Sequence, residues 1–181
     1  LEFRRVLFRS GYLVTRILLR VRQAGSRLLG LRAFYIRRLL RIFPAYYLWV
    51  AVGIVAVPYV RSTWPWHVGY LSNLLFYNQA EWAGPVSHWW SLAVEEQFYL
   101  VWPLAVLFTP GPLLLPLICV GIAIAAPFRA GLTAAGHPLA FVGILTPSVL
   151  DCLGLGSLLG LVSASPESEW RRLIGGGVLA I

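Results

Sequence analysis

Uncharged apolar runs, each about as long as a membrane is thick, alternate with short polar segments along this chain. Residues 42–60 carry no charged side chain. A helix rises about 1.5 Å per residue, so this run covers roughly the 30 Å hydrocarbon core of a bilayer. Residues 97–128 form a longer uncharged run, but Thr109-Pro110-Gly111-Pro112 interrupts it with residues that break helices and favour turns. The pattern therefore predicts several separate membrane helices.

Four complete spans and the start of a fifth are expected. They cover about residues 42–60, 88–108, 113–128 and 139–163, and a further apolar stretch begins at residue 173. Residues 165–172 are polar enough to form a loop. Residues 68–77 are too short to cross a bilayer and are predicted to form an interfacial or re-entrant helix. The expected fold class is all-α, a polytopic helical transmembrane bundle.

The composition excludes an ordinary soluble domain. Hydrophobic residues make up 59% of the 181 residues and charged residues 12%, with a mean hydropathy of +0.74. Soluble domains average about 45–50% apolar and about 25% charged residues. The two cysteines, Cys119 and Cys152, lie in apolar runs where a small thiol packs well, and no Cys and His spacing suggests a metal site. No metal and no bound cofactor is expected.

The positive charge lies mostly near the N-terminus. All fifteen basic residues are Arg, the net charge is +8, and eleven of the Arg residues fall within residues 4–41. Such a block could bind nucleic acid, but it runs directly into an apolar span, which is typical of a cytoplasmic segment beside a membrane. Membrane lipids are therefore the expected partner, and nucleic acid is not. The positive-inside rule places this segment in the cytoplasm, and four passes return the chain there at Arg171-Arg172.

Residues 34–47 hold the first candidate site. On a helix, Arg38 and Arg41 share a face, and so do Arg37 and Arg41. Clustered guanidinium groups bind phosphate or carboxylate, although they also anchor a helix to anionic lipid head groups. Arg41 lies directly against an apolar span, where an unpaired charge is costly. This position favours a ligand or a buried partner.

Residues 88–103 hold the second candidate site. Ser91 and Glu95 are four residues apart, and aromatic residues surround Glu95 on the same side of the helix. Glu95 or Glu96 could merely complement the dipole of the helix N-terminus. Two acids in one apolar segment are nevertheless functional candidates, with Arg38 or Arg41 as a possible counter-ion if the helices meet.

Three ordered motifs resemble those of a known family. A Ser-Gly-Phe/Tyr-Leu-Ile-Thr stretch is matched by Ser10, Gly11, Tyr12, Leu13, Val14 and Thr15. A Phe-Tyr-x-Arg-Arg-x-x-Arg-Ile-x-Pro-x-Tyr motif is matched by Phe34, Tyr35, Arg37, Arg38, Arg41, Ile42, Pro44 and Tyr46. A Trp-Ser-Leu-x-x-Glu-x-x-Phe-Tyr-x-x-x-Pro motif is matched by Trp90, Ser91, Leu92, Glu95, Phe98, Tyr99 and Pro103, and a looser Asp-x-Leu-x-x-Gly pattern by Asp151, Leu153 and Gly156. Over residues 10 to about 163, the chain resembles the integral-membrane acyltransferase 3 family.

The resemblance implies a membrane-bound O-acyltransferase of the bacterial inner (plasma) membrane, most simply an acetyltransferase. It would move an acyl group from a cytoplasmic acyl-CoA type donor to a hydroxyl of a cell-surface glycan or glycolipid, such as a polysaccharide or lipopolysaccharide. Arg38 and Arg41 are expected to bind the donor phosphates, with Arg37 also touching substrate. The remaining substrate-binding candidates are Trp90, Ser91 and Tyr99. Glu95 is expected to act as a membrane-embedded polar anchor that orients a base or pairs with an Arg.

Family members carry their proposed catalytic His in a helix that precedes the Ser-Gly-Tyr-Leu stretch, and residues 1–9 contain no His. We expect these nine residues to be foreign to the native protein, and residues 10–181 to be part of the membrane domain, truncated at both ends. His88 is a candidate general base near Glu95, or else an interfacial His that only hydrogen-bonds backbone or water. His67 and His137 are expected in loops.

Two other functions remain open from the sequence. The Arg cluster with Glu95 or Asp151 could form an ion or lipid pathway in a transporter or flippase. Alternatively, the chain alone could be inactive, because half a bundle does not assemble a complete site.

Overall fold

The computed structural model describes residues 2–164, and this part of the chain is helical without strands, which confirms the predicted fold class. The α-helices are α1 (Glu2–Gln23), α2 (Arg27–Ala56), α3 (Pro58–Val68), α4 (Ser72–Gln79), α5 (Trp89–Phe108), α6 (Gly111–Ala134), α7 (Leu139–Val142) and α8 (Leu150–Ala164). Two short 3₁₀ turns, η1 (Gly84–Val86) and η2 (Thr146–Val149), precede α5 and α8. The predicted polar loop at 165–172, with Arg171-Arg172, and the apolar stretch from residue 173 lie outside the described residues.

Among the described residues, four helical segments are long and apolar enough to cross a membrane, so the chain is an integral membrane protein. They are Arg27–Ala56, Gly84–Phe108, Gly111–Ala134 and Thr146–Ala164. Between α2 and α5, the predicted interfacial segment forms the short helix α4, whose eight residues are too few to cross a bilayer.

The first span differs from the predicted residues 42–60. Helix α2 begins at Arg27 and ends at Ala56, and Pro58 opens α3. Steric clash disfavours the helical region for the residue before a proline, and Val57 is extended with φ −119° and ψ 110°. The start at Arg27 was not predicted, because the span was defined by its uncharged residues and the first turns of α2 contain several Arg residues.

The predicted span 139–163 is also not one helix. Gly143 ends α7, and Pro147 lies in η2, so the continuous helix α8 begins only at Leu150. Helix α6, by contrast, is longer than the predicted residues 113–128. It continues through Pro127 and ends at Ala134.

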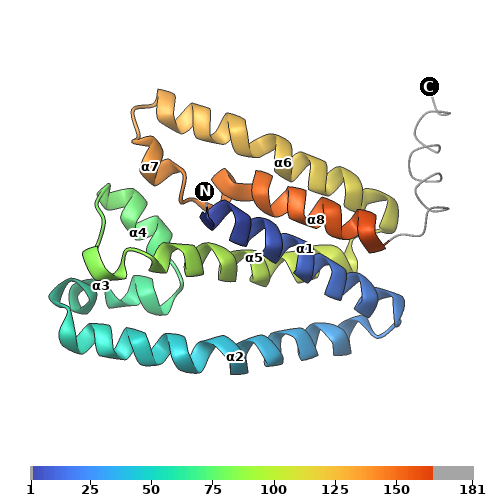
Figure 1. Cartoon of the computed structure of the whole chain (residues 1–181), viewed down its shortest axis with the longest axis horizontal. Coiled ribbons are helices and arrows are strands. Elements are labelled where there is room, and N and C mark those ends of the chain that lie inside the picture. Colours follow the sequence, from blue (N-terminus) through green and yellow to red (C-terminus); the bar gives the residue numbers. More distant parts are fainter. Residues whose placement is uncertain (1, 165–181) are drawn as a thin grey trace.

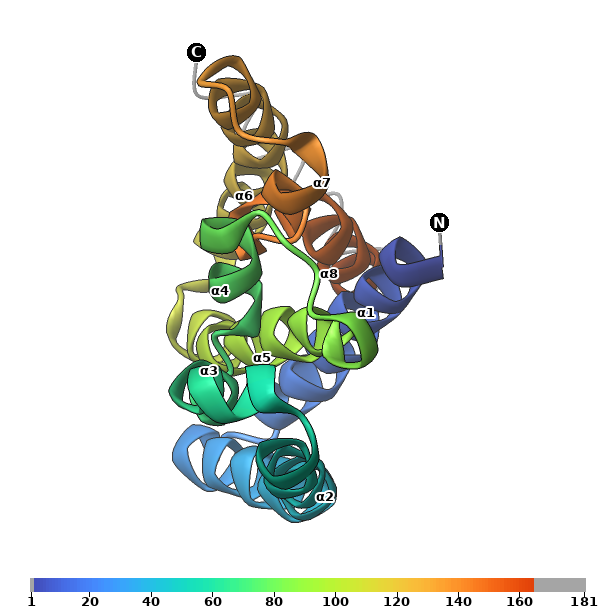
Figure 2. The same ribbon diagram turned by 90° about the vertical axis from the view of Figure 1, so that its left-hand side faces the viewer.

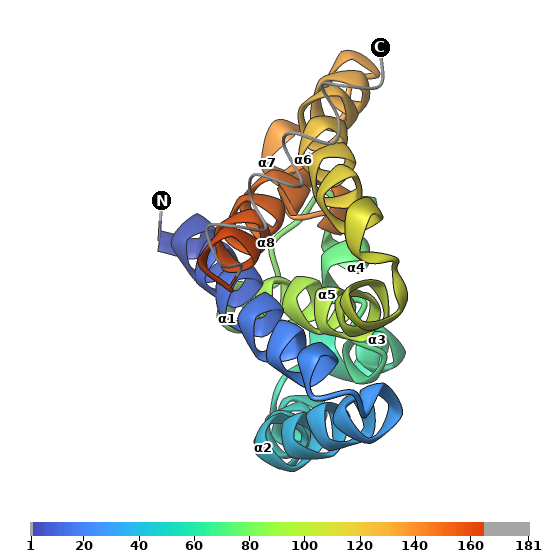
Figure 3. The same ribbon diagram turned by 90° about the vertical axis from the view of Figure 1, so that its right-hand side faces the viewer.

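The helices form a layered bundle (Figure 1). Views along the bundle show α2 at one edge and α6 at the opposite edge, with α1, α5 and α8 between them (Figures 2 and 3). The largest buried cluster, which includes Leu7, Leu18, Phe98 and Leu153, joins these middle helices. A second cluster around Tyr46 and Trp89 joins α2 to α5.

Small residues allow α1 and α8 to pack backbone against backbone. A Cβ added at Gly156 would lie 2.0 Å from the carbonyl oxygen of Phe8, and one added at Gly11 would lie 2.2 Å from that of Leu153. Close approach through glycines is a common way for membrane helices to associate. The contact fixes the Ser-Gly-Tyr-Leu stretch of α1 against the Asp-x-Leu-x-x-Gly stretch of α8.

Residues 2–9 form the first turns of α1. Leu7 is fully buried, and the ring of Phe3 lies 4.2 Å from that of Trp90. The origin of residues 1–9 stays a prediction, and reading the DNA that encodes them tests it.

Candidate functional site

The second and third motifs meet along the contact between α2 and α5, which run antiparallel. Near one end of this contact, the Tyr35 hydroxyl donates a hydrogen bond of 2.7 Å to the Leu100 carbonyl. Near the other end, Gly53 lies against the ring of Trp89. The predicted basic and acidic segments therefore face each other within the bundle.

An ion pair joins the two segments. Arg38 donates through Nε at 3.1 Å and through Nη2 at 2.9 Å to Oε1 of Glu96. The Arg38 guanidinium also lies over the ring of Tyr99, 3.1 Å from the ring centroid, which is a cation–π contact. The two charged side chains are only 20% and 13% exposed. The prediction that Arg38 is a counter-ion for an acid of this segment holds, and its partner is Glu96.

Glu95 has a different partner. It accepts a hydrogen bond of 3.1 Å from the Tyr99 hydroxyl, and within the described residues no Arg lies within ion-pair distance of it. Successive residues on a helix are rotated by about 100°, since a turn has 3.6 residues. Glu96 therefore pairs with Arg38 while Glu95 is turned toward the Tyr99 hydroxyl, which sequence spacing alone did not resolve.

A cavity of about 690 Å³ lies where α1, α2 and α5 meet, and we call it the basic hollow. Its polar lining consists of Arg37, Arg38, Arg41, Glu95 and Tyr99, and its apolar lining of Ile17, Val21, Gly30, Ala33, Phe34 and Ile42. In the described part of the chain, Arg37 and Arg41 form no ion pair. The hollow thus holds two free guanidinium groups beside a third that is paired.

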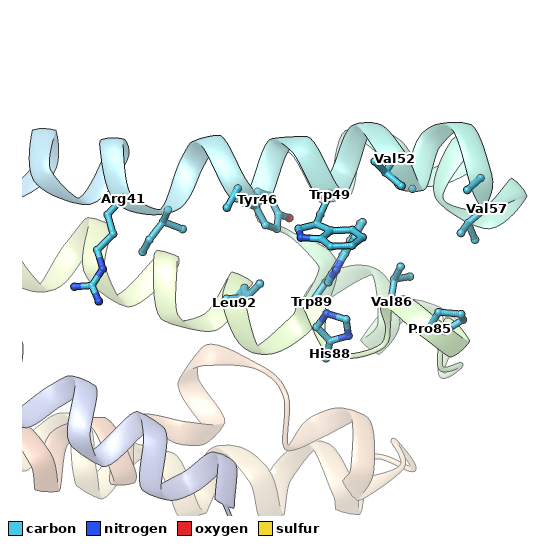
Figure 4. Close-up of a pocket in the computed structure, with 14 residues that line it drawn as sticks. Arg41, Tyr46, Trp49, Val52, Val57, Pro85, Val86, His88, Trp89 and Leu92 are labelled. Atoms are coloured by element: carbon cyan, nitrogen blue, oxygen red, sulfur yellow. The ribbon is translucent and has the colours of Figure 1, made fainter.

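A second cavity of about 580 Å³ continues from the first along α2 and α5, and we call it the apolar groove (Figure 4). Arg41 and Ile42 line both cavities. From Arg41, the groove passes Tyr46, Trp49 and Leu92 and reaches His88 and Trp89 near the start of α5. One continuous surface therefore leads from the Arg cluster to His88.

The structure does not bring His88 and Glu95 together. His88 is an exposed residue at the N-cap of α5, and Glu95 lies seven residues later. Two helical turns separate them by about 10 Å of rise. The two predicted catalytic residues thus belong to different cavities, His88 to the apolar groove and Glu95 to the basic hollow.

Two other candidates make structural contacts. The Ser91 hydroxyl donates to the His88 carbonyl at 2.9 Å, a bond within the first turn of α5. Trp90 packs edge-on against Phe3 of α1. Neither residue lines the basic hollow or the apolar groove, whereas Tyr99, the third of these candidates, lines the hollow.

The prediction that His67 lies in a loop is wrong. His67 is fully buried in the last turn of α3, where Nε2 lies 3.1 Å from the Thr63 hydroxyl and Nδ1 lies 2.8 Å from the Ser72 hydroxyl. Thr63 donates its own proton to the Tyr59 carbonyl, so Nε2 carries the imidazole proton and Nδ1 accepts from Ser72. Burial lowers the pKa of His67 to about 4, and the ring stays neutral near pH 7. His137 does lie exposed in the segment after α6.

Gln97 is a residue that sequence reasoning missed. Its amide nitrogen donates to the Tyr70 carbonyl and to the Asn73 side chain, both at 2.9 Å, and its amide oxygen accepts from Thr146. It therefore ties α5 to α4 and η2. The available signal was a polar residue directly after Glu96 in an otherwise apolar run.

This arrangement defines a class, a helical membrane protein with a basic hollow that opens into an apolar groove. A family model described as an acyltransferase domain matches residues 7–181, and the chain belongs to that family. The resemblance found in the three motifs is thereby confirmed. The transporter alternative is not favoured by this assignment.

Two relatives give the match more detail. Peptidoglycan O-acetyltransferase OatA of Listeria monocytogenes is 32% identical over 135 residues, which are 62% of this chain and 21% of that protein. O-acetyltransferase OatA of Staphylococcus aureus is 34% identical over 119 residues, 55% of this chain and 19% of that protein. The chain thus spans about a fifth of the length of these relatives. No solved structure matches the chain.

Proposed function

We propose that this chain is part of a membrane O-acetyltransferase that takes an acyl group from an acyl-CoA type thioester and places it on a hydroxyl of a peptidoglycan-like glycan. Family membership supports acyl transfer. The printed names of the two relatives support an acetyl group, and the Listeria name supports peptidoglycan as the acceptor class. A lipopolysaccharide acceptor, which the motifs alone left open, has no support from these names.

The observation that carries the proposal is the basic hollow with its free Arg37 and Arg41. Guanidinium groups bind phosphate oxygens through paired charge-assisted hydrogen bonds, and a coenzyme A donor carries several phosphates. The lining of the hollow is otherwise apolar except for Arg38, Glu95 and Tyr99. It therefore suits a ligand with an anionic head and a long, less polar arm.

The apolar groove supplies a route for that arm. It adjoins the hollow at Arg41 and follows α2 and α5 toward His88. In the transfer step, a base removes the proton of the acceptor hydroxyl while its oxygen bonds to the thioester carbonyl carbon. The tetrahedral oxyanion then collapses, the carbon–sulfur bond breaks, and the thiolate leaves. His88 is our candidate for the base, and Glu95, held by Tyr99, is our candidate for the polar anchor within the hollow.

The orientation follows from the same residues. With the Arg-rich start of α2 in the cytoplasm, α5 returns from the outer side, and α6 and α8 complete four passes. The donor phosphates then bind on the cytoplasmic side, where acyl-CoA is made, and His88 lies toward the outer side. We propose the bacterial plasma membrane as the location.

An acetylation assay tests this function. Membranes that hold the complete protein containing this chain are given radiolabelled acetyl-CoA, and acetyl esters on the glycan are counted. Arg41→Ala is expected to reduce ester formation at least tenfold. Arg61→Ala is the matched control, because Arg61 lies in α3 and donates to the Ile54 and Val55 carbonyls outside both cavities. Equal loss in both variants, or none in Arg41→Ala, would refute the proposed role of the Arg cluster.

A further inference from the structure

The basic hollow contains one acidic side chain, Glu95, among its polar lining. Three guanidinium groups line the same cavity, yet within the described residues Glu95 forms an ion pair with none of them. Arg38, the nearest of the three to be paired, is held by Glu96. Ionisable side chains inside a membrane span either pair with one another or mark a substrate pathway. Glu95 does not pair, and its position therefore points to a ligand.

Only one oxygen of the Glu95 carboxylate makes a hydrogen bond. Oε2 accepts from the Tyr99 hydroxyl at 3.1 Å, and no donor of the described residues reaches Oε1. Oε1 is nevertheless not a buried atom without a partner, since the one such side-chain atom among the described residues belongs to Tyr70. Oε1 is thus accessible, and the cavity that Glu95 lines is the basic hollow. The hollow therefore offers a free hydrogen-bond acceptor beside its free Arg residues.

Glu95 lies level with the Arg cluster. Helices α2 and α5 run antiparallel, and Arg38 bonds Glu96. One residue earlier on α5, Glu95 is therefore level with the stretch of α2 between Arg38 and Arg41. Phosphate groups bound by Arg37 and Arg41 are repelled by a carboxylate, because both carry negative charge. The part of the ligand that meets Glu95 must instead present a hydrogen-bond donor.

The proposed path of the donor identifies that part. A coenzyme A thioester consists of phosphates, a long arm and an adenine base. The arm leaves the hollow past Arg41 and follows the apolar groove, which Glu95 does not line. The base consequently stays in the hollow with the phosphates. Its amino group carries N–H donors, and the two apolar faces of its ring suit the side chains of Ile17, Val21 and Phe34, which line the hollow from α1 and α2.

We propose that the basic hollow binds the adenine base of the donor and that the amino group of this base donates a hydrogen bond to Oε1 of Glu95. This inference rests on the proposed function and makes Glu95 a residue that determines which donor is accepted. Tyr99 holds the carboxylate by its Oε2 atom and leaves Oε1 to the ligand. The Tyr99 ring is itself covered by the Arg38 guanidinium, 3.1 Å from the ring centroid. The contact therefore forms on a carboxylate that is already oriented.

CoA and its deaminated form test this assignment. They share the phosphates and the arm, but in deaminated CoA a carbonyl replaces the amino group of the base. Their dissociation constants are measured by titration calorimetry on the complete protein that contains this chain, in phosphatidylcholine nanodiscs, whose lipid head groups have no N–H donor. The intact protein is expected to bind CoA about tenfold or more tightly than deaminated CoA, because a hydrogen bond to a charged group has this order of effect.

Glu95→Gln changes the expected selectivity without removing the side chain. Its amide accepts from the amino group of CoA through oxygen and donates to the carbonyl of deaminated CoA through nitrogen. The variant also lacks the negative charge beside the phosphates. It is therefore expected to bind deaminated CoA more tightly than the intact protein does, so that the two probes bind with comparable affinity. A merely damaged fold would weaken both probes instead.

Glu81→Gln is the matched control, because it makes the same chemical change at an exposed residue that lines neither the hollow nor the groove. It is expected to keep the tenfold preference for CoA. Thermal unfolding is measured on both variants, and each is expected to melt with the intact protein.

The outcomes distinguish the two proposals. If the intact protein binds neither probe, the proposed donor function fails, and this inference fails with it. If the intact protein binds both probes equally, or if Glu95→Gln keeps the preference for CoA, the Glu95 inference is refuted while donor binding stands. Equal weakening of both probes by Glu95→Gln would also refute it, because Glu95 would then support the hollow without contacting the base.

Discussion

Arg38 on α2 donates two hydrogen bonds to a single carboxylate oxygen of Glu96 on α5, at 2.9 and 3.1 Å. Both side chains are largely shielded from solvent. Removing one member of such a pair leaves an uncompensated charge, which costs about 3–5 kcal/mol when the pair is buried. Arg38→Ala is therefore expected to destabilise the protein strongly, as measured by thermal unfolding in detergent.

The double variant Arg38→Ala with Glu96→Ala is the control for this prediction. Because it removes both charges, it is expected to melt above Arg38→Ala alone, while acetyl transfer stays lost. A single Arg38→Ala variant as stable as the intact protein would show that the pair does not hold α2 to α5.

Gly156 is a second determinant of the bundle. A Cβ at this position would lie 2.0 Å from the Phe8 carbonyl oxygen, so Gly156→Ala forces α1 and α8 apart. We expect a loss of about 1–3 kcal/mol, the usual cost of overpacking, seen as a lower midpoint of unfolding. Gly121→Ala on α6 meets no atom within 4 Å and is expected to change little. Equal midpoints for the two variants would contradict the close helix contact.

His67 makes stability depend on pH. Its pKa falls from 6.5 in the unfolded chain to about 4 when it is buried, so protonation favours the unfolded state. The stability from His67 is complete above about pH 6.5 and is lost as the pH falls toward 4, by about 3 kcal/mol in total. Unfolding measured from pH 7.5 to 4 is expected to show this decline in the intact protein and a flatter profile in His67→Gln.

His137→Asn provides the comparison for the pH experiment, because His137 is exposed in the segment after α6. This variant is expected to keep the full decline. If His67→Gln declines as steeply as the intact protein between pH 6.5 and 4, another group causes the loss.

The sequence predicted the break between α5 and α6 but not the break at Val57. Thr109-Pro110-Gly111-Pro112 combines several helix breakers, whereas Pro58 stands alone in an apolar run. The start of α2 was not predicted, because its Arg residues suggested a surface segment, whereas they lie in the first half of one long helix. A helix boundary is therefore predicted reliably from the local sequence only where several helix-breaking residues occur together.

The candidate site was predicted in part. Residue types and spacing singled out Arg38 and Arg41, and the structure places both at the basic hollow. The choice of Glu96 over Glu95 as the partner of Arg38 depends on how α5 is rotated against α2, and that rotation is set by tertiary packing. The positive φ of Tyr70 and its buried hydroxyl without a hydrogen bond could not be predicted from the sequence, because both are set by tertiary packing.

The proposed orientation predicts which loops are reached from outside the cell. After Cys119→Ser and Cys152→Ala remove the native thiols, single cysteines are placed at Ser26, between α1 and α2, and at His137, after α6. A maleimide that does not cross membranes is expected to label His137→Cys in intact cells and Ser26→Cys only after permeabilisation. The opposite pattern would invert the topology and move the Arg cluster to the outer side.

Binding of CoA to the chain in nanodiscs tests the central claim most directly, because the basic hollow is proposed to hold the donor phosphates. Arg41→Ala removes one free guanidinium of the hollow, and charge-assisted hydrogen bonds contribute about 1.5–3 kcal/mol each. The account predicts that Arg41→Ala weakens CoA binding by about tenfold or more, that Arg37→Ala weakens it in the same direction, and that Arg61→Ala leaves it unchanged. Equal CoA affinity in the intact chain, Arg37→Ala and Arg41→Ala would contradict it.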